Sequence, residues 1–377
     1  MILAGHEVEG CLEQLAEIEA RYRDLAGSRA GESVYRVAGR WLVEEGHLRD
    51  RLLSGMARAL RARPRTPFIG GLKTAPLARA ALSGPRLRSR SKAVAICFKQ
   101  NIRAFYLETR PVTLKMANPT SWGRSVREEI GIRQRLDHAP GVSLPRLIAS
   151  DPGGRPPYFW EELVFGRHLH SKRDHAFFLG QVLPRILDFY QGRGVRHTLG
   201  ADFLDFERLV ADVLEVVDQA RWSSRWIDRA RFRARVAASG EAANRYLLVG
   251  MGHGDLSNGN ILITEDDRVC LVDWSRSREL ILMQDLEKLF QEYPGSWAAT
   301  VDRLEALRPR EVDSQRLVSW SDQALLGTLQ LIQFFGAIRE RLRSRRDDLG
   351  ERYVLQCDRN LAKEFATATR LIETGQL

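Results

Sequence analysis

The chain has 377 residues, 44% of them hydrophobic and 28% charged, so it is long enough for two lobes and has a globular composition. Its apolar runs are far short of a membrane span and its N-terminus lacks the basic and then apolar order of a signal peptide, which predicts a cytoplasmic protein. Four scattered cysteines without a Cys-x-x-Cys pair argue against disulfides and a zinc site.

The net charge of +10 is unevenly distributed. Residues 51–110 contain fourteen Lys and Arg residues and one acidic residue, Glu108, a local balance of +13. Such a segment favours an anionic partner, namely nucleotide phosphates, a phosphorylated glycolipid or the inner membrane as a peripheral contact, and we do not expect nucleic acid. The alternative is an arginine-rich, solvated surface, because only seven of the 58 basic residues are lysine.

The first part of the chain is expected to be helical. Apolar residues recur at intervals of three and four over residues 7–25, which predicts an amphipathic helix, and a second helix is expected over residues 32–60. These helices would form an N-terminal extension, residues 1–65, that packs on the next lobe or, alternatively, docks on a membrane or partner. Proline and glycine residues over 64–85 predict a loop region.

Three strand-like runs follow the loop region, at residues 93–98, 102–108 and 111–116. The last run carries Lys115, and Lys99 is the alternative if the strands are misplaced. The turn between the first two runs, Lys99-Gln100-Asn101, contains no glycine, so a glycine-rich phosphate loop is not evident.

A helix is expected after these strands, over residues 125–136, where Glu128 and Glu129 compete for one inward position. A strand lysine followed by a helix with an inward glutamate is an arrangement that holds nucleotide phosphates. Residues 147–166 then contain two apolar runs separated by Gly153-Gly154, which predicts a hairpin or, alternatively, an ordinary edge strand with a turn.

From residue 176 onward the apolar periodicity is helical. Helices are expected at residues 177–190, 203–217 and 226–248, and again over 316–377 with an inward apolar face at 325–335. The helix ending at residue 248 is expected to lead directly into a polar loop.

That polar loop carries the strongest functional signal of the chain. It reads His253-Gly254-Asp255 with Asn260 five residues further, and a turn-containing segment and an apolar strand then lead to Asp273. A hairpin would bring Asn260 and Asp273 together. This is the layout of a phosphoryl-transfer site. In such a site one carboxylate accepts the proton of an attacking hydroxyl, and an amide and a second carboxylate hold magnesium. The alternative is that these residues only cap turns.

The pattern resembles the protein-kinase-like superfamily, in the branch of aminoglycoside phosphotransferases and lipopolysaccharide (Kdo/core) kinases. The resemblance is strongest from His253 to Asp273. It implies a bilobal α+β fold with an antiparallel small lobe at residues 66–165, a mostly helical large lobe at 166–377 and the N-terminal helical extension. Gly254, Ser257 and Trp274 differ from protein kinases and favour a small-molecule or glycan acceptor over a peptide.

The resemblance also implies site residues, with ATP and Mg²⁺ as cofactors. Asp255 would be the catalytic base, and Asn260 with Asp273 would hold the metal. Lys115 would hold the phosphates and pair with Glu129, which matches the family's helix better than Glu128. The backbone of Glu162, Leu163 and Val164 would bond adenine, and Asp285 would be a helix cap or a brace for the loop.

Arg276 and Arg278 follow Asp273 closely, as basic residues do in the lipopolysaccharide-core kinases that this stretch resembles. They would suit an anionic sugar or glycolipid acceptor, unless they pair with Glu279 or Glu287 on the surface. The sequence therefore predicts Mg-ATP-dependent phosphorylation of a sugar hydroxyl in an anionic envelope glycolipid. The alternatives are an antibiotic or metabolite kinase, and a non-catalytic kinase-like scaffold whose basic segment faces a membrane or nucleic acid.

Overall fold

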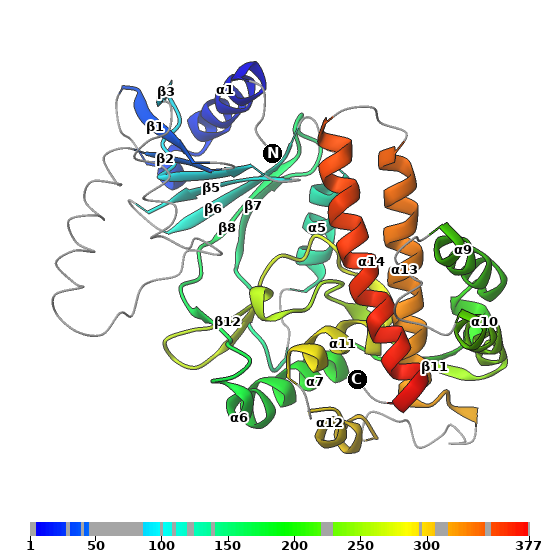
Figure 1. Ribbon diagram of the computed structural model, residues 1–377. Coiled ribbons are helices and arrows are strands. Elements are labelled where there is room, and N and C mark those ends of the chain that lie inside the picture. The colour runs from blue at the N-terminus through cyan, green and yellow to red at the C-terminus, as the bar shows by residue number, and fades with distance from the viewer. Residues whose placement is uncertain are drawn as a thin grey trace. The chain divides into compact units, whose positions relative to one another are not determined.

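The structure is a computed structural model (Figure 1), and it describes residues 5–27, 31–38, 41–44, 86–98, 101–107, 111–118, 124–136, 140–219, 229–293, 296–305, 316–343 and 348–375. The chain forms two compact units. Unit 1 comprises Met1–Leu169 with Gly259–Arg276, and unit 2 comprises His170–Asn258 with Ser277–Leu377. Among the described residues, no helix is long and apolar enough to cross a membrane.

Unit 1 contains a sheet of eight strands in the order β3-β1-β2-β4-β5-β6-β8-β7, with every neighbouring pair antiparallel. Its strands are β1 (Ser33–Ala38), β2 (Trp41–Glu44), β3 (Arg86–Ser89), β4 (Ala95–Phe98), β5 (Asn101–Tyr106), β6 (Val112–Ala117), β7 (Leu147–Asp151) and β8 (Tyr158–Glu162). A smaller sheet joins β9 (Arg167–His168), β12 (Ile261–Ile263) and β13 (Val269–Leu271). The predicted antiparallel lobe and the hairpin over residues 147–166 are confirmed.

Different helices cover the two faces of the large sheet. Leu114 of β6 packs in one core cluster with Leu15 of α1 (Gly5–Arg21), which continues into the short helix α2 (Arg23–Ala26). Phe159 of β8 packs in another cluster with Ile130 of α5 (Arg124–Arg135). Because successive side chains of a strand point to opposite faces, Lys115 lies on the α5 side.

A buried carboxylate ties α1 to the sheet. Glu19 accepts hydrogen bonds from Ser91 Oγ at 2.6 Å, Tyr106 Oη at 2.7 Å and the backbone amide of Lys92 at 2.8 Å. Burial raises the pKa of Glu19 above its ordinary value, although these three donors act in the opposite direction. The N-terminal helix is therefore joined to the lobe by specific polar contacts as well as by apolar packing.

The second predicted helix, over residues 32–60, is wrong where the structure describes it. Residues 33–38 and 41–44 form β1 and β2, and β3 lies between the predicted loop region and the first predicted strand, where no element was expected. Val34, Tyr35 and Trp41 are β-branched or aromatic and favour strands, and Tyr35 is buried with its hydroxyl donating to the Ala93 carbonyl at 2.7 Å. Residues 45–60, like most of the basic segment, lie outside the described part of the chain.

Unit 2 is mainly helical. Its long helices α13 (Trp320–Arg343) and α14 (Asp348–Thr374) lie side by side (Figure 1). α13 buries the inward face predicted over residues 325–335. The other helices are α6 (His175–Phe177), a π-helical segment (Phe178–Val182), α7 (Leu183–Gly192), α8 (Gly200–Phe203), α9 (Phe206–Gln219), α10 (Arg229–Ala238), α11 (Leu282–Glu292) and α12 (Ser296–Glu305). A sheet joins β10 (Arg196–Leu199), β11 (Tyr246–Gly252) and β14 (Arg278–Ile281) in that order.

The prediction that a helix leads directly into the polar loop is wrong. After α10 and a 3-10 turn, Ser239–Asn244, the chain enters the loop through the strand β11. β11 is central in its sheet and largely buried, so its side chains are apolar on both faces. A short apolar run of this kind cannot be assigned to helix or strand by periodicity alone.

Candidate active site

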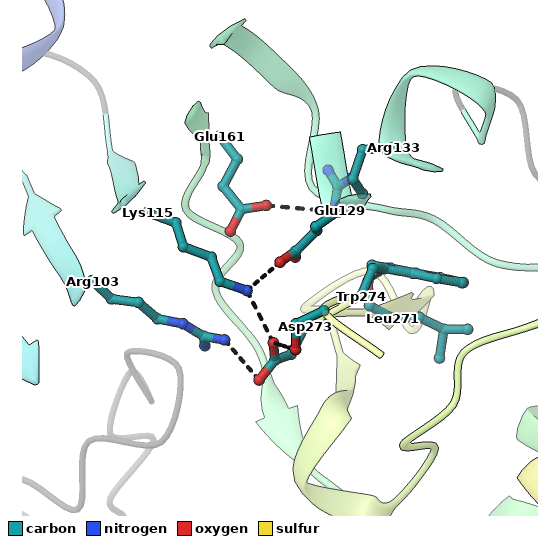
Figure 2. Close-up of polar contacts among 9 residues, drawn as sticks. Arg103, Lys115, Glu129, Arg133, Glu161, Leu271, Asp273 and Trp274 are labelled. Carbon is teal, nitrogen blue, oxygen red and sulfur yellow. Dashed lines mark hydrogen bonds and ion pairs between the residues drawn. The ribbon is translucent and has the colours of Figure 1, made fainter. Parts of the chain in front are cut away.

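The polar centre of unit 1 lies around Lys115, which is 1% exposed (Figure 2). Its ammonium group forms an ion pair with Glu129 of α5 and lies 3.1 Å from Asp273 Oδ1. Glu129 is also 1% exposed. A charge buried this deeply requires a partner of opposite sign, and Lys115 has two. The structure thus brings together Lys115, Glu129 and Asp273, which come from a strand, a helix and the segment after a hairpin.

Asp273 has several polar contacts. Arg103 of β5 places Nη2 2.6 Å from Asp273 Oδ2, and Ser275 donates to Oδ1 at 3.0 Å. Burial by itself raises the pKa of Asp273, but the adjacent Arg103 and Lys115 hold it well below its ordinary value. The Asp273 carboxylate is therefore ionised at neutral pH.

A hairpin positions Asp273. Strands β12 and β13 pair antiparallel from Ile261 opposite Leu271, and the Val272 amide donates to the Asn260 carbonyl at 3.0 Å. Asn260 and Asp273 therefore lie at the same end of the hairpin. Asp273 has a φ of 67°, a left-handed conformation that aspartate and asparagine tolerate better than most residues.

The segment expected to meet adenine begins at the last residue of β8, Glu162. The Glu162 amide donates to the Arg146 carbonyl at 2.9 Å, and the Leu163 amide donates to the Pro111 carbonyl at 3.0 Å. Both amides are thus engaged within the protein, which sequence reasoning missed. Gly166 lies three residues beyond Leu163. A Cβ atom at this position would lie 2.7 Å from the Ile263 carbonyl oxygen, so the close contact with β12 requires glycine.

Asp285 of α11 braces the polar loop of unit 2, as predicted. It accepts hydrogen bonds from the backbone amides of His253 and Gly254, the latter at 2.7 Å, and from the Tyr190 hydroxyl at 2.6 Å. A Cβ atom on Gly252 would lie 2.6 Å from Asp285 Oδ2. The carboxylate and the loop backbone therefore fit together closely, and this contact fixes the start of the loop.

The same helix holds the loop at two further points. Lys288 donates to Asp255 Oδ1 at 2.7 Å, and Glu292 Oε2 accepts from the Asn258 amide at 2.9 Å. Asp285, Lys288 and Glu292 are spaced i, i+3 and i+7, so they lie on one face of α11. Of these three residues only Asp285 was predicted from the sequence. The spacing of Lys288 and Glu292 from Asp285 was the available signal.

The two arginines after Asp273 have different environments. Arg276 is partly buried in the turn before β14, and Arg278 places its guanidinium 5.8 Å from the centre of the Phe334 ring. Of their alternative partners, Glu279 forms an ion pair with Arg196 at 2.9 Å. Glu287 is buried and accepts a hydrogen bond from Thr328 at 2.8 Å.

Several solved structures resemble this chain. Choline kinase LicA from Streptococcus pneumoniae has 15% sequence identity and a TM-score of 0.44, over 71% of this chain and 91% of that chain. A putative aminoglycoside phosphotransferase from Ralstonia eutropha has 12% identity and a TM-score of 0.47, over 75% and 92% of the two chains. The GDP and kanamycin complex of APH(2")-IIIa has 12% identity and a TM-score of 0.47, over 72% and 91%.

Comparison with curated protein sequences gives no match. The model of the phosphotransferase enzyme family, APH, matches residues 100–318, a range that includes Lys115, Glu129, Asp255, Asn260 and Asp273. This range is more than half of the 377 residues. The chain therefore belongs to the phosphotransferase enzyme family and is a kinase that acts on a hydroxyl acceptor.

Proposed function

We propose that this kinase transfers the γ-phosphate of Mg-ATP to a sugar hydroxyl of an anionic envelope glycolipid, as a lipopolysaccharide-core-type kinase. The main support for ATP binding is that one buried ammonium group, Lys115 Nζ, contacts both Glu129 and Asp273. In a phosphoryl-transfer site the lysine holds the phosphates, the glutamate orients the lysine, and an aspartate holds the metal.

Asp273 and Asn260 would hold the magnesium ion. The donor set fits this ion, because Mg²⁺ prefers hard oxygen ligands and the Asp273 carboxylate stays ionised. The Asn260 amide lies at the same end of the hairpin. Bound there, the metal would neutralise charge on the phosphates.

Asp255 is the proposed catalytic base. It would accept the proton of the acceptor hydroxyl and orient the oxygen for attack on the γ-phosphate. Its loop is held by the hydrogen bonds of Asp285 to the amides of His253 and Gly254. A base held in this way needs little reorganisation before reaction.

Adenine would be bound by the backbone at the end of β8, from Glu162 to Val164. Since the Glu162 and Leu163 amides donate within the protein, we assign the adenine contacts to the carbonyl groups of these residues and to the Val164 amide. A purine edge offers both donors and acceptors, so a carbonyl and an amide suffice to bind it.

The anionic acceptor is inferred from Arg276 and Arg278. Two guanidinium groups close in sequence to Asp273 would favour a phosphorylated or carboxylated sugar and would repel a polycationic aminoglycoside. The basic segment at residues 51–110 would assist by peripheral contact with an anionic membrane at its cytoplasmic face. An antibiotic or metabolite is the rival acceptor.

The test is transfer of labelled phosphate from ATP to cell-envelope extracts and, in parallel, to a panel of aminoglycosides and small alcohols. We expect labelling of a glycolipid fraction that Asp255→Asn lowers by about 100-fold or more, because a general base contributes that much. Arg276→Gln combined with Arg278→Gln should raise the KM for the glycolipid and leave the KM for ATP unchanged. Labelling of an aminoglycoside instead of the glycolipid would overturn the proposed acceptor, and equal labelling by Asp255→Asn would overturn the proposed base.

A further inference from the structure

Arg103 lies beside Lys115 in the polar centre of unit 1. The two residues are opposite each other in neighbouring strands, β5 and β6, so their side chains leave the same face of the sheet. Both reach Asp273, at 2.6 Å from Arg103 Nη2 and 3.1 Å from Lys115 Nζ (Figure 2). A guanidinium group thus lies next to the ammonium group that is proposed to hold phosphate.

The cations of this centre differ in how firmly they are held. Lys115 and Glu129 form a pair with side chains 1% exposed, and Arg133 lies 3.4 Å from Glu161 with side chains 2% and 17% exposed. Arg103 and Asp273 are both 25% exposed. The pair of Arg103 with Asp273 is therefore the one that a ligand from solvent can reach.

The sequence before β5 bears on the role of this guanidinium group. A glycine-rich loop binds nucleotide phosphates through backbone amides, but the sequence Lys99-Gln100-Asn101 contains no glycine. Without glycine, backbone amides approach a phosphate less closely, so donors from side chains become more important. Arginine has five donors in a planar fork that matches phosphate geometry, and Arg103 is two residues beyond Asn101.

We infer that Arg103 is a nucleotide-binding residue whose guanidinium contacts the β- or γ-phosphate beside Lys115, in the role that loop amides have elsewhere. In the structure the same group pairs with Asp273. The inference rests on the proposed binding of Mg-ATP. The competing role for Arg103 is a structural one, in which it only fixes the Asp273 side chain.

Two variants separate these roles. Arg103→Met removes the charge and the donors, and Arg103→Lys keeps the charge but loses the fork. The matched control is Arg127→Met, because Arg127 is exposed on α5 and donates to the Pro152 carbonyl at 2.8 Å. Dissociation constants for ATP, ADP and adenosine are measured calorimetrically for the full chain and each variant, both with Mg²⁺ and in EDTA, where an effect that acts only through Asp273 and its metal is absent.

We expect Arg103→Met to weaken ATP and ADP about 10- to 100-fold, since hydrogen bonds between charged groups are the strong ones, and to leave adenosine unchanged. Arg103→Lys should lie between it and the wild type, and Arg127→Met should equal the wild type. Unchanged ATP affinity in Arg103→Met, a loss seen with Mg²⁺ but not in EDTA, or equal losses for ATP and adenosine would overturn the inference alone. A wild-type protein that binds neither ATP nor ADP would overturn the proposed function and the inference with it.

Discussion

Lys288 Nζ lies 2.7 Å from Asp255 Oδ1, so the proposed catalytic base has an ammonium group as its partner. Lys288 is 13% exposed and Asp255 is 33% exposed. The contact depends on α11, whose same face also holds the loop through Asp285 and Glu292. One helix therefore controls both the backbone of the loop and the charge next to its carboxylate.

Replacing Lys288 should change the pH dependence of the reaction. A carboxylate that loses an adjacent positive charge takes up a proton at higher pH, so Lys288→Met should move the acidic limb of the kcat/KM profile to higher pH and lower kcat by about tenfold. The carboxyl group of Glu364 on α14 also interacts electrostatically with Asp255, and it remains in the variant.

The control for this prediction is Lys288→Arg, which keeps the positive charge and should restore the position of the acidic limb. Both profiles are measured with saturating ATP and varied acceptor. A lower kcat without any movement of the limb in Lys288→Met would mean that Lys288 only supports the local structure.

Asp285 should contribute strongly to stability. It is 1% exposed and accepts from two backbone amides and the Tyr190 hydroxyl. Asp285→Ala leaves buried donors without an acceptor, so we expect the free energy of unfolding to fall by about 3 kcal/mol. Tyr190→Phe removes one donor and should cost about 1 kcal/mol. Urea denaturation measures both, and equal costs for the two variants would contradict the bracing role.

Glu287 and Glu364 form a buried pair of carboxyl groups in unit 2. Burial and the neighbouring Glu364 raise the pKa of Glu287 well above 4.5, and burial raises the pKa of Glu364. Folding therefore favours the protonated acid. Its contribution to stability is complete below the unfolded-state pKa and is lost as the pH rises through the raised folded-state pKa.

Glu287→Gln should consequently stabilise the protein at neutral pH. The amide resembles the protonated acid, because its oxygen can accept from Gln291 Nε2, which lies 2.8 Å from Glu287 Oε1. Its NH₂ group can donate to Thr328 Oγ1, which lies 2.8 Å from Glu287 Oε2 and can donate to the Ala324 carbonyl instead. Urea denaturation at pH 5 and pH 8 should show stability falling with pH for the wild type and falling less for the variant. A larger fall in Glu287→Gln than in the wild type would show that Glu287 is ionised in the folded protein.

The buried Glu19 gives a stability prediction for unit 1. Oε1 accepts from Ser91 and Tyr106, and Oε2 accepts from the Lys92 amide. A glutamine can retain the first two bonds, but its NH₂ group then faces the Lys92 amide, so Glu19→Gln should cost about 1 kcal/mol and Glu19→Ala about 3 kcal/mol. The control is Glu17→Gln, because Glu17 is exposed on the same helix. Equal costs for Glu17→Gln and Glu19→Gln would contradict the anchoring role.

Short-range patterns predicted much of the site but not all of it. Local spacing predicts the hairpin from Asn260 to Asp273, and it predicts that the helix α5 follows the strand that carries Lys115. Both could therefore be predicted from the sequence. Arg103 could not be predicted in this way, because its position opposite Lys115 depends on the register of two strands. The only local signal was its place between the buried Ile102 and Ala104.

The errors in the predicted fold have a similar cause. β1 pairs with β3 across residues 39–85, and β11 lies between two strands that are distant in sequence. Such pairings depend on the tertiary fold, whereas the helical spacing of α13 is contained within the helix itself. Lys288 was missed because it acts through the loop that α11 contacts, which its own sequence does not reveal.

Replacement of Asp273 by asparagine tests the charge of the proposed metal ligand alone. The positive φ of Asp273 suits asparagine, whereas alanine would add backbone strain. With the carboxylate gone, Arg103 and Lys115 have one negative partner fewer, so Asp273→Asn should bind ATP in EDTA at least as tightly as the wild type. It should also lose the gain in ATP affinity that Mg²⁺ gives, and phosphate transfer should fall by a factor of about 1,000 because positioning and charge neutralisation are lost together. Calorimetric titration of ATP with and without Mg²⁺ measures the two affinities. An equal gain from Mg²⁺ in the variant and the wild type would show that the ion is held elsewhere.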